Sequence, residues 1–373
     1  MKMKNNNKGI TLVALVITII ILLILAGITI ASLTQTGLFA AAQDAKTKTE
    51  EKTEEENTIL EEYEDAITEQ VTGKKPLKPL ETNKKYESKA ELKDANGNKI
   101  VVPAGFKIVS DATTNNATTV DQGIVIEDAT GTATNGSQFV WIPVGDIKKA
   151  DGTTTSIALN RYSFDSNGVA TEYTSTNFFE EDKTNTTSLK NYGNTISENI
   201  NSFKTSVATN GGFYIGRYEA RKNNSSGKLT TVKTDSVWNN ITQPNAATNS
   251  KNMYSTGVTS ELMNSYAWDT ATLFLQTFGT QSEKKYSRQN SLNTEILELN
   301  GTDNDKQCNV YDMASNVREW TTETCSDSDK PCTDRGGDYD FSDSYTSYRC
   351  GTSTSSSSST FGFRPILYFS SVL

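Results

Sequence analysis

The 373-residue chain contains no histidine, only four cysteines and only seven prolines. Without imidazole groups it cannot build a Ser-His-Asp or Cys-His catalytic centre, a histidine-ligated metal site or a histidine pH switch. Carboxylate, thiol, lysine or tyrosine chemistry remains, as does binding without chemistry. Apolar residues are modest at 35%, and Ser, Thr, Asn, Asp and Gly are abundant. This composition favours a loop-rich β or α+β domain with a small core for its length.

Basic residues are outnumbered by acidic ones, 36 to 45, so the formal net charge is −9. Removal of residues 1–9 would take three lysines with it and make the remainder more acidic. A negative surface repels nucleic acid and anionic membrane surfaces. We therefore expect no nucleic-acid partner.

The N-terminal segment has the pattern of a membrane anchor. Residues 1–9 (MKMKNNNKG) are polar and basic, and residues 10–33 (ITLVALVITIIILLILAGITIASL) contain no charged side chain. As a helix the uncharged run would span about 36 Å, enough to cross a hydrocarbon core of about 30 Å with some tilt. Lysines precede the run and acidic residues follow it, which predicts a cytoplasmic N-terminus and export from about Thr34 onward. We expect a single-pass protein of the cell membrane with its C-terminal domain outside.

Residues 8–13 (KGITLV) resemble the class III signal of type IV prepilins. In that family the basic leader is cut after the glycine and the new N-terminus is methylated, which implies a cut after Gly9 and a mature chain that begins at Ile10. The family carries Glu at the fifth mature position, where this chain has Ala14. Because that Glu helps subunits find their register in a filament, the resemblance implies a minor pilin or a helix-anchored protein, with pilin-like subunits as partners, rather than a major pilin.

A helical stalk is expected over residues 34–72. One apolar stripe repeats there at three- and four-residue spacing, formed by Leu60, Tyr63, Ile67 and Val71. Residues 46–57 are too polar to pack; a solvated stalk and an acidic interaction face both stay open. Residues 73–79 (GKKPLKP) predict the end of the helix and a linker over residues 73–85, because proline removes a donor and disfavours helix at the preceding residue.

The exported domain is expected over residues 86–373, where short β-like runs begin. Residues 94–98 (DANGN) predict a hairpin turn before a strand at 99–103, since Asn-Gly between apolar runs is a strong hairpin signal. Further strands are predicted at 106–109, 123–127, 139–144 and 212–218. One helix is predicted over residues 259–278, with an apolar face formed by Leu262, Met263, Tyr266, Leu273, Phe274 and Phe278.

Five short motifs follow one another in this domain. They are FVWIP (139–143), GFYIGRYE (212–219), NVYDMASNVREW (309–320), RGGDY (335–339) and FGFR (361–364). Together they resemble the formylglycine-generating-enzyme (sulfatase-modifying-factor) domain, a variant of the C-type-lectin-like fold, over roughly residues 100–369. The resemblance implies an α+β protein in which a transmembrane and stalk helix precedes a loop-rich C-type-lectin-like domain.

Several motif residues have plain structural roles to fill. Gly336 and Gly337 allow positive φ or close backbone approach, and Trp320 supplies a large buried aromatic ring. Arg335 and Arg364 are expected to bridge loops to carboxylates, because a guanidinium pairs bidentately.

The resemblance also bears on catalysis. In the enzyme, two cysteines that follow the R-G-G motif bind copper and support oxidation of a substrate cysteine by oxygen. The corresponding positions here are Phe341 and Thr346, and copper of that type needs soft thiolate ligands. Iron-dependent relatives use histidines, which this chain lacks. We therefore expect no copper and no catalytic residue; an oxidase with an altered site is the alternative.

The four cysteines are even in number, lie in the last quarter of the chain and are predicted to be exported, which favours two disulfides. Three connectivities are possible. We expect Cys325–Cys332, which closes a short loop around Pro331, and Cys308–Cys350, which joins two of the motifs. Buried thiols are the alternative.

The motif at 309–320 implies a calcium site. In the resembled family this segment wraps a calcium ion, which implies ligands from the Asp312 side chain, the backbone at Ser315 and Val317, and Glu319. Calcium is a hard cation that prefers carboxylate and carbonyl oxygens. The alternative is that Glu319 pairs with an arginine or caps a turn.

The ligand-binding surface is predicted in residues 338–348, with help from residues 353–360. By the resemblance this segment occupies the enzyme's substrate cleft, and tyrosines with adjacent polar groups suit recognition. The candidate residues are Asp338, Tyr339, Phe341, Asp343, Tyr345 and Tyr348. We expect a non-catalytic, surface-displayed adhesion or ligand-binding protein with an extracellular protein or glycan as its partner. The alternatives are a structural pilus component and a receptor diversified by a retroelement, because such receptors use this fold and vary this end.

Overall fold

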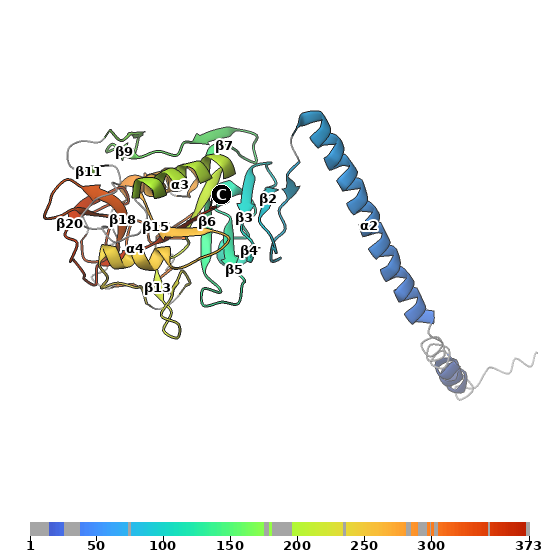
Figure 1. Cartoon of the computed structure of the whole chain (residues 1–373). Helices are drawn as coiled ribbons and strands as arrows, with labels where there is room; N and C mark the ends of the chain where they lie inside the picture. The colour runs from blue at the N-terminus through green and yellow to red at the C-terminus, as the bar shows by residue number, and fades with distance from the viewer. Residues whose placement is uncertain are drawn as a thin grey trace, which may run out of the picture. The chain divides into compact units, whose positions relative to one another are not determined.

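The computed structural model describes residues 15–25, 38–73, 76–174, 179–180, 196–233, 236–280, 285–289, 297–298, 300–301, 305–341 and 344–370. The chain is a mixed α+β protein with two compact units, Met1–Pro76 and Leu77–Leu373 (Figure 1).

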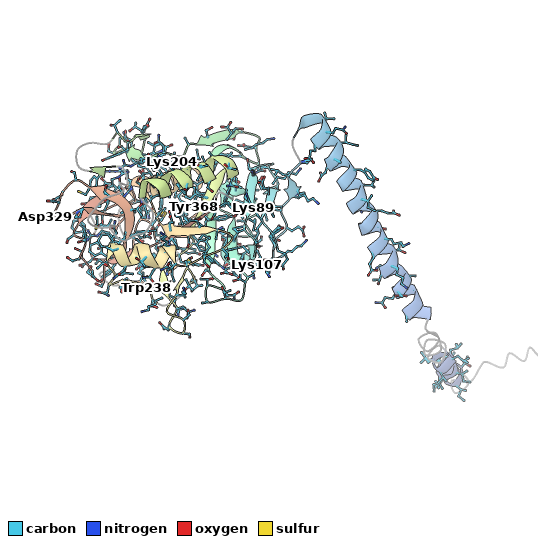
Figure 2. The ribbon with its side chains drawn as sticks, viewed as in Figure 1. Lys89, Lys107, Lys204, Trp238, Asp329 and Tyr368 are labelled. Carbon is cyan, nitrogen blue, oxygen red and sulfur yellow. The ribbon has the colours of Figure 1, made fainter. Side chains whose placement is uncertain are left out.

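The first unit contains the long helix α2 (Leu38–Thr72), which agrees with the helix predicted over residues 34–72; its role as a stalk stays a prediction. It ends at Gly73, whose φ is 69° and whose N–H donates to the Glu69 carbonyl at 2.8 Å. Glycine takes this left-handed conformation at little cost and so terminates helices readily. Side chains project outward along the helix (Figure 2), and the predicted apolar stripe is 60% to 79% exposed.

The predicted membrane span is not confirmed. Residues 15–25 are helical, with exposed apolar side chains. Among the helices that the structure describes, none is long and apolar enough to cross a membrane. The rest of the predicted run over residues 10–33, and the leader with Gly9 and Ile10, lie outside the described residues.

The second unit begins at Leu77, earlier than the boundary expected at residue 86. Strand β1 (Lys78–Pro79) pairs in parallel with β2 (Ala90–Lys93), which pairs antiparallel with β3 (Lys99–Val102). Thr82 and Lys85 then form isolated bridges to β4 (Phe106–Val109). Backbone pairing thus draws most of the predicted linker into the domain.

The predicted hairpin between β2 and β3 is confirmed. Asp94 Oδ1 accepts hydrogen bonds from the N–H groups of Asn96 and Asn98, at 2.9 and 2.8 Å. Gly97 takes a φ of 86°. The side-chain hydrogen bonds of Asp94 and the glycine conformation together form the turn.

A six-stranded sheet forms the centre of this unit, in the order β15-β22-β12-β6-β5-β4. Its remaining strands are β5 (Val125–Asp128), β6 (Gln138–Pro143), β12 (Gly212–Gly216), β15 (Thr259–Leu262) and β22 (Pro365–Tyr368). The strands predicted at 106–109, 123–127, 139–144 and 212–218 correspond to β4, β5, β6 and β12.

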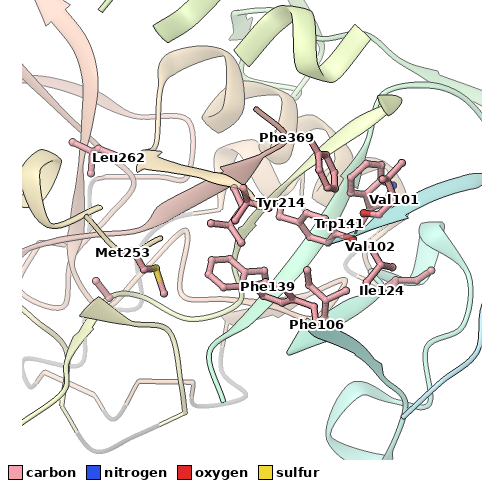
Figure 3. Packing of buried hydrophobic residues seen from close by; sticks show 14 of the residues in the cluster. Val101, Val102, Phe106, Ile124, Phe139, Trp141, Tyr214, Met253, Leu262 and Phe369 are labelled. Atoms are coloured by element: carbon pink, nitrogen blue, oxygen red, sulfur yellow. Dashed lines mark hydrogen bonds between the residues drawn. The ribbon is translucent and has the colours of Figure 1, made fainter. Parts of the chain in front are cut away.

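Side chains alternate between the two faces of this sheet along each strand. A hydrophobic core covers each face. On one face Val140 and Ile142 join a core with side chains of α3 (Ile196–Asn210) and α5 (Ser265–Phe278). On the other, Phe139 and Trp141 join a core with Tyr214 and with residues of β3 and of α4 (Gln243–Lys251). Figure 3 shows this second core, where Trp141 and Tyr214 lie 4.9 Å apart between ring centroids.

The helix predicted over residues 259–278 is correct only from Ser265 onward. Residues of β15 pair with β22 at the sheet edge instead. The helix starts after Asn264, whose side chain accepts from the Ala267 N–H at 2.9 Å. An Asn N-cap of this kind marks a helix start, and the strand before it is stabilised by sheet pairing.

A second sheet contains β11 (Phe179–Glu180), β18 (Arg318–Cys325), β19 (Cys332–Arg335) and β20 (Arg349–Thr352) in that order, and β21 (Phe361–Phe363) runs parallel to β18. Trp320 of β18 is fully buried, as predicted, and stacks on Phe361 at 4.6 Å.

Short elements complete the unit. The two-stranded pairs are β7 (Gly145–Lys148) with β8 (Thr154–Ile157), β9 (Tyr162–Phe164) with β10 (Ala170–Glu172), β13 (Arg221–Lys222) with β14 (Leu229–Thr230), and β16 (Lys306–Gln307) with β17 (Val310–Tyr311). Three 3-10 helices are η1 (Ala112–Thr114), η2 (Val120–Gln122) and η3 (Tyr286–Arg288).

Candidate functional site

The two segments predicted to bind ligand meet at one end of the second sheet. Residues 336–348 connect β19 to β20, and residues 353–360 connect β20 to β21. The register pairs Arg335 with Arg349 and Arg318 with Phe361, so β19, β20 and β21 reach the same end. A hydrogen bond of 2.8 Å between the Tyr339 and Ser359 hydroxyls joins the two segments.

Beneath these loops lies a buried ionic network, here called the arginine network: Arg161, Arg335, Arg349, Asp269 and Glu323. Arg335 pairs with Asp269 at 2.5 Å and with Glu323 at 3.2 Å. Glu323 also forms ion pairs with Arg161 at 2.5 Å and with Arg349 at 2.9 Å. Arg349 in turn donates a hydrogen bond to Asp269. The predicted structural role of Arg335 is confirmed. The network joins β18, β19, β20 and α5 under the candidate surface.

The electrostatics of this network favour an ionised Glu323. Burial alone would raise the pKa of its carboxyl, but Arg349, Arg335 and Arg161 outweigh that effect and hold the pKa at about 2. Removing one member of a buried ion network leaves its partners uncompensated, which is strongly destabilising. The network therefore holds β19 and β20 in place at the base of the loops.

The connection between β19 and β20 is fixed at both ends. Gly336 has a φ of 77°, and a Cβ there would lie 2.6 Å from the Met313 carbonyl oxygen, which confirms the predicted need for glycine. At the other end Thr346 is buried; its hydroxyl donates to the Tyr286 carbonyl at 2.7 Å, and its own carbonyl accepts from the Trp268 indole at 2.9 Å.

This connection carries four aromatic side chains, here called the aromatic surface: Tyr339, Phe341, Tyr345 and Tyr348. Phe341 is 48% exposed, and the three tyrosines are half-buried. Tyr345 and Tyr348 meet edge to face at 5.6 Å. Large aromatic rings held partly exposed by a rigid base are the usual anchors of a binding surface.

The two aspartates predicted to bind ligand are not part of this surface. Asp338 is fully buried, where it pairs with Arg318 at 2.5 Å and accepts from the Asp340 N–H at 2.9 Å. It therefore shapes the turn and does not face outward. Asp343 lies outside the described residues.

Sequence reasoning missed two arginines at this surface. The Arg288 guanidinium lies 3.7 Å from the Tyr345 ring centroid, and Arg318 lies 5.4 Å from that of Phe361. Arg318 could have been suspected from its place in the 309–320 motif. Arg288 lies in η3, outside all five motifs, and carried no signal.

Asp312 and Glu319, which are predicted to bind calcium through their side chains, belong to a buried acidic cluster. The cluster consists of Glu219, Asp305, Asp312 and Glu319, and one arginine, Arg364, lies among these carboxyls. The Glu319 carboxylate is held by Arg364 at 2.7 Å, as predicted for Arg364 and as in the alternative interpretation for Glu319. Asp312 Oδ2 accepts from the Gly301 N–H at 2.9 Å.

Two further observations bear on calcium. Ser315 and Val317 are buried; the Ser315 hydroxyl donates to Asp305 and the Val317 N–H to Glu219. In the part of the chain that the structure describes, no three Asp, Glu, Cys or His side chains are arranged to hold a metal ion. The calcium site therefore stays a prediction.

Burial raises the pKa of Glu219 well above its ordinary value, and Asp312 and Glu319 add to the shift. Burial likewise raises the pKa of Asp312, with Asp305 next in importance, and that of Asp305 itself. One arginine is shared among four carboxyls, so protons or a cation must balance the excess negative charge.

The predicted disulfides are absent: none of the four cysteines, all of them described, forms one. Cys308 lies in the turn between β16 and β17, with its sulfur 3.7 Å from the Asp121 carbonyl oxygen. Cys350 lies in β20, where it pairs with Asp334 of β19. In the β18–β19 hairpin Cys332 pairs with Thr324, and the Cys325 N–H binds the Pro331 carbonyl. The register thus places Cys325 opposite Phe179 of β11 rather than opposite Cys332.

Comparisons with known proteins add little. A search of solved structures matched a Treponema denticola protein described as variable protein 1, at 14% identity over 64% of this chain and 98% of that chain, with a TM-score of 0.28. That likeness is too low to support an argument. No family model and no curated protein matches the chain. The C-type-lectin-like architecture and the prepilin signal therefore stay predictions, on a fold that is α+β.

Proposed function

We propose that this chain is a non-catalytic ligand-binding protein displayed on the cell surface, held at the membrane by its N-terminal segment, and that the aromatic surface binds an extracellular protein or glycan. The observation that supports the proposal most is the combination of one exposed and three half-buried aromatic rings with a rigid base. Phe341 is 48% exposed, while the arginine network, which holds Arg335 and Arg349 at the two ends of the β19–β20 connection, is buried and ion-paired.

A pre-formed surface of this kind binds without ordering its loops first, which lowers the entropic cost of association. Tyrosine and phenylalanine rings supply large contact areas, and truncation of such an anchor usually costs about 2 kcal/mol or more of binding free energy. The Arg288 guanidinium lies over the Tyr345 ring, 3.7 Å from its centroid, and adds a cation to which a ligand carboxylate could bind.

The test begins with the second unit, residues 77–373, screened against panels of glycans and extracellular proteins. For any ligand found, Phe341→Ala and Tyr345→Ala should each weaken binding more than tenfold. Val169→Ala is the matched control, because Val169 is an apolar side chain with 56% exposure outside this surface. Unfolding must be measured in parallel by circular dichroism.

Two results would count against the proposal. Equal affinity of the wild type, Phe341→Ala and Tyr345→Ala would place the binding surface elsewhere. A loss of folding in both variants, with no ligand-specific effect, would assign the rings to the core.

A second candidate function is a structural component of a pilus-like assembly. The observation that favours it is the exposed apolar stripe of α2, in which Leu60 and Ile67 are 60% and 61% exposed. A helix of 35 residues with such a stripe is stabilised by packing against a partner helix.

A further inference from the structure

One cavity of the second unit lies away from the aromatic surface. It has a volume of about 800 Å³ and is bordered by η1, the start of β6, the segments that follow β12, β14 and α5, and the β16–β17 hairpin. Its polar lining includes Thr113, Asn115, Gln138 and Thr280, and none of its described lining residues is acidic. In a chain with net charge −9, such a lining is unusual.

Arg217 places a buried positive charge behind the lining of this pocket, where it holds two lining residues, Thr113 and Gln138. The residue is fully buried, and its guanidinium donates to the Thr113 carbonyl at 2.6 Å, the Gln138 side-chain carbonyl at 2.6 Å and the Asn309 carbonyl at 3.3 Å. All three acceptors are neutral, and no carboxylate among the described residues forms an ion pair with it. The carboxylate that interacts with it electrostatically, Asp111, is exposed to solvent and forms no ion pair with it. Because a buried charge with so little compensation is costly, a bound anion would stabilise it.

Two lysines and two stacked tyrosines complete the pocket. The rings of Tyr218 and Tyr311 stack at 5.0 Å, and the Arg217 guanidinium lies 5.2 and 5.4 Å from their centroids. Lys233 and Lys306 lie 6.0 and 5.3 Å from the Tyr311 ring. Lys233 is exposed at the rim, and Lys306 Nζ donates to the Thr113 carbonyl at 3.2 Å. Four carboxylates adjoin lining residues in sequence: Asp111 caps η1, and Glu219, Asp305 and Asp312 belong to the buried acidic cluster.

We propose that this pocket binds an acidic sugar, either as a free monosaccharide or as a unit of an acidic glycan. The cations select a carboxylate, and the amide and hydroxyl groups of the lining match sugar hydroxyls. A volume of about 800 Å³ lies within the usual range for small-molecule sites. The pocket is a second binding site, independent of the aromatic surface.

The test is calorimetric titration of residues 77–373 with glucuronic acid and N-acetylneuraminic acid, with glucose and inorganic phosphate as comparison ligands. We expect both acidic sugars to bind at least tenfold more tightly than glucose and phosphate, and their binding to weaken as salt is added, because salt screens exposed charges. Lys233→Glu should weaken acidic-sugar binding at least tenfold, since it reverses a charge at the rim.

Lys228→Glu is the matched control, because it makes the same charge change at an exposed lysine that does not line this pocket. It should leave acidic-sugar binding unchanged, as should Phe341→Ala. Four results would overturn the proposal: no binding of either acidic sugar, phosphate or glucose bound equally well, equal losses in Lys233→Glu and Lys228→Glu, or a loss in Phe341→Ala. The last result would transfer the ligand to the aromatic surface.

Discussion

Buried carboxyls of this domain lie in two opposite electrostatic environments. Glu323 sits among three arginines, which hold its pKa at about 2. Asp312 sits beside other carboxyls and shares a single arginine, so its pKa is raised well above the ordinary value, mainly by burial. Removing one negative charge should therefore have opposite effects on stability at the two positions.

Glu323→Gln is expected to destabilise the domain by about 3 kcal/mol or more at pH 7, because it leaves three buried guanidiniums with only Asp269. The native pKa is depressed, so the stability that Glu323 contributes is present above its unfolded pKa of about 4.3 and is lost as the pH falls toward 2. Urea unfolding of residues 77–373 should show a wild-type advantage at pH 7 that shrinks below pH 4.

Asp312→Asn is expected to stabilise the domain. The native pKa of Asp312 is raised, so its ionisation opposes folding above the unfolded pKa of about 3.9, and the penalty grows as the pH rises. Asp312 also has a φ of 63°, a conformation that Asn tolerates well. We expect the melting temperature to rise by a few degrees at pH 7, about 1 kcal/mol for a domain of this size, and the gain to vanish near pH 4. Equal destabilisation by both variants would contradict this account.

Calcium offers a second way to balance the acidic cluster. If Asp312 and Glu319 bind it, calcium at about 100 times its dissociation constant adds about 2.7 kcal/mol to stability. We expect the wild type to melt several degrees higher in calcium than in chelator, and Asp312→Asn to lose that difference. Identical wild-type melts in calcium and chelator would reject the site and leave protons as the balancing charge.

Among the elements, the sequence predicted those whose signals are local. The hairpin at 94–98 and the strands at 106–109 and 139–144 depend on Asn-Gly and on apolar alternation, which are read within a few residues. Residues 259–262 were assigned to a helix because their periodicity continues that of α5, yet they pair with β22 more than 100 residues later in the chain. A single sequence carries no signal for that pairing.

The candidate site shows the same division. The motifs at 335–339 and 361–364 marked the loops, the structural arginines and the positive φ of Gly336. They did not show that Asp338 faces inward to Arg318, or that Arg288 reaches Tyr345. The cavity around Arg217 is made by segments from across the domain, so only the folded chain could reveal it.

Helix α2 carries the prediction that distinguishes a stalk from an assembly element. Its stripe is exposed within its unit, and burying such a stripe against another helix would stabilise both helices. We expect the full chain in membranes to form cross-linked oligomers that Leu60→Ser with Ile67→Ser abolishes. Lys52→Ser with Glu69→Ser, on polar positions of the same helix, should leave cross-linking unchanged. Oligomers that survive the apolar substitutions would exclude this stripe as the contact.

At the scale of the whole molecule, the two units follow a charge pattern along the chain. A basic leader, an uncharged run, a polar helix and an acidic domain succeed one another. Lysines resist transfer across the membrane, so this order favours export of everything after the uncharged run. Protease added to intact cells should therefore digest the second unit and spare the N-terminal segment.

Processing after Gly9 follows from the same pattern and from the likeness of residues 8–13 to a prepilin signal. Mass spectrometry of the membrane-bound protein should show a mature N-terminus at Ile10, with or without a methyl group. Gly9→Val should block the cut, because a β-branched side chain replaces the small residue that precedes the cleaved bond. Gly27→Val, which changes the other glycine of the N-terminal segment in the same way, should still be cut. An intact Met1 in the wild type would leave a plain anchor, and a cut beyond Leu33 would make the uncharged run a secretory signal that is removed from the mature protein.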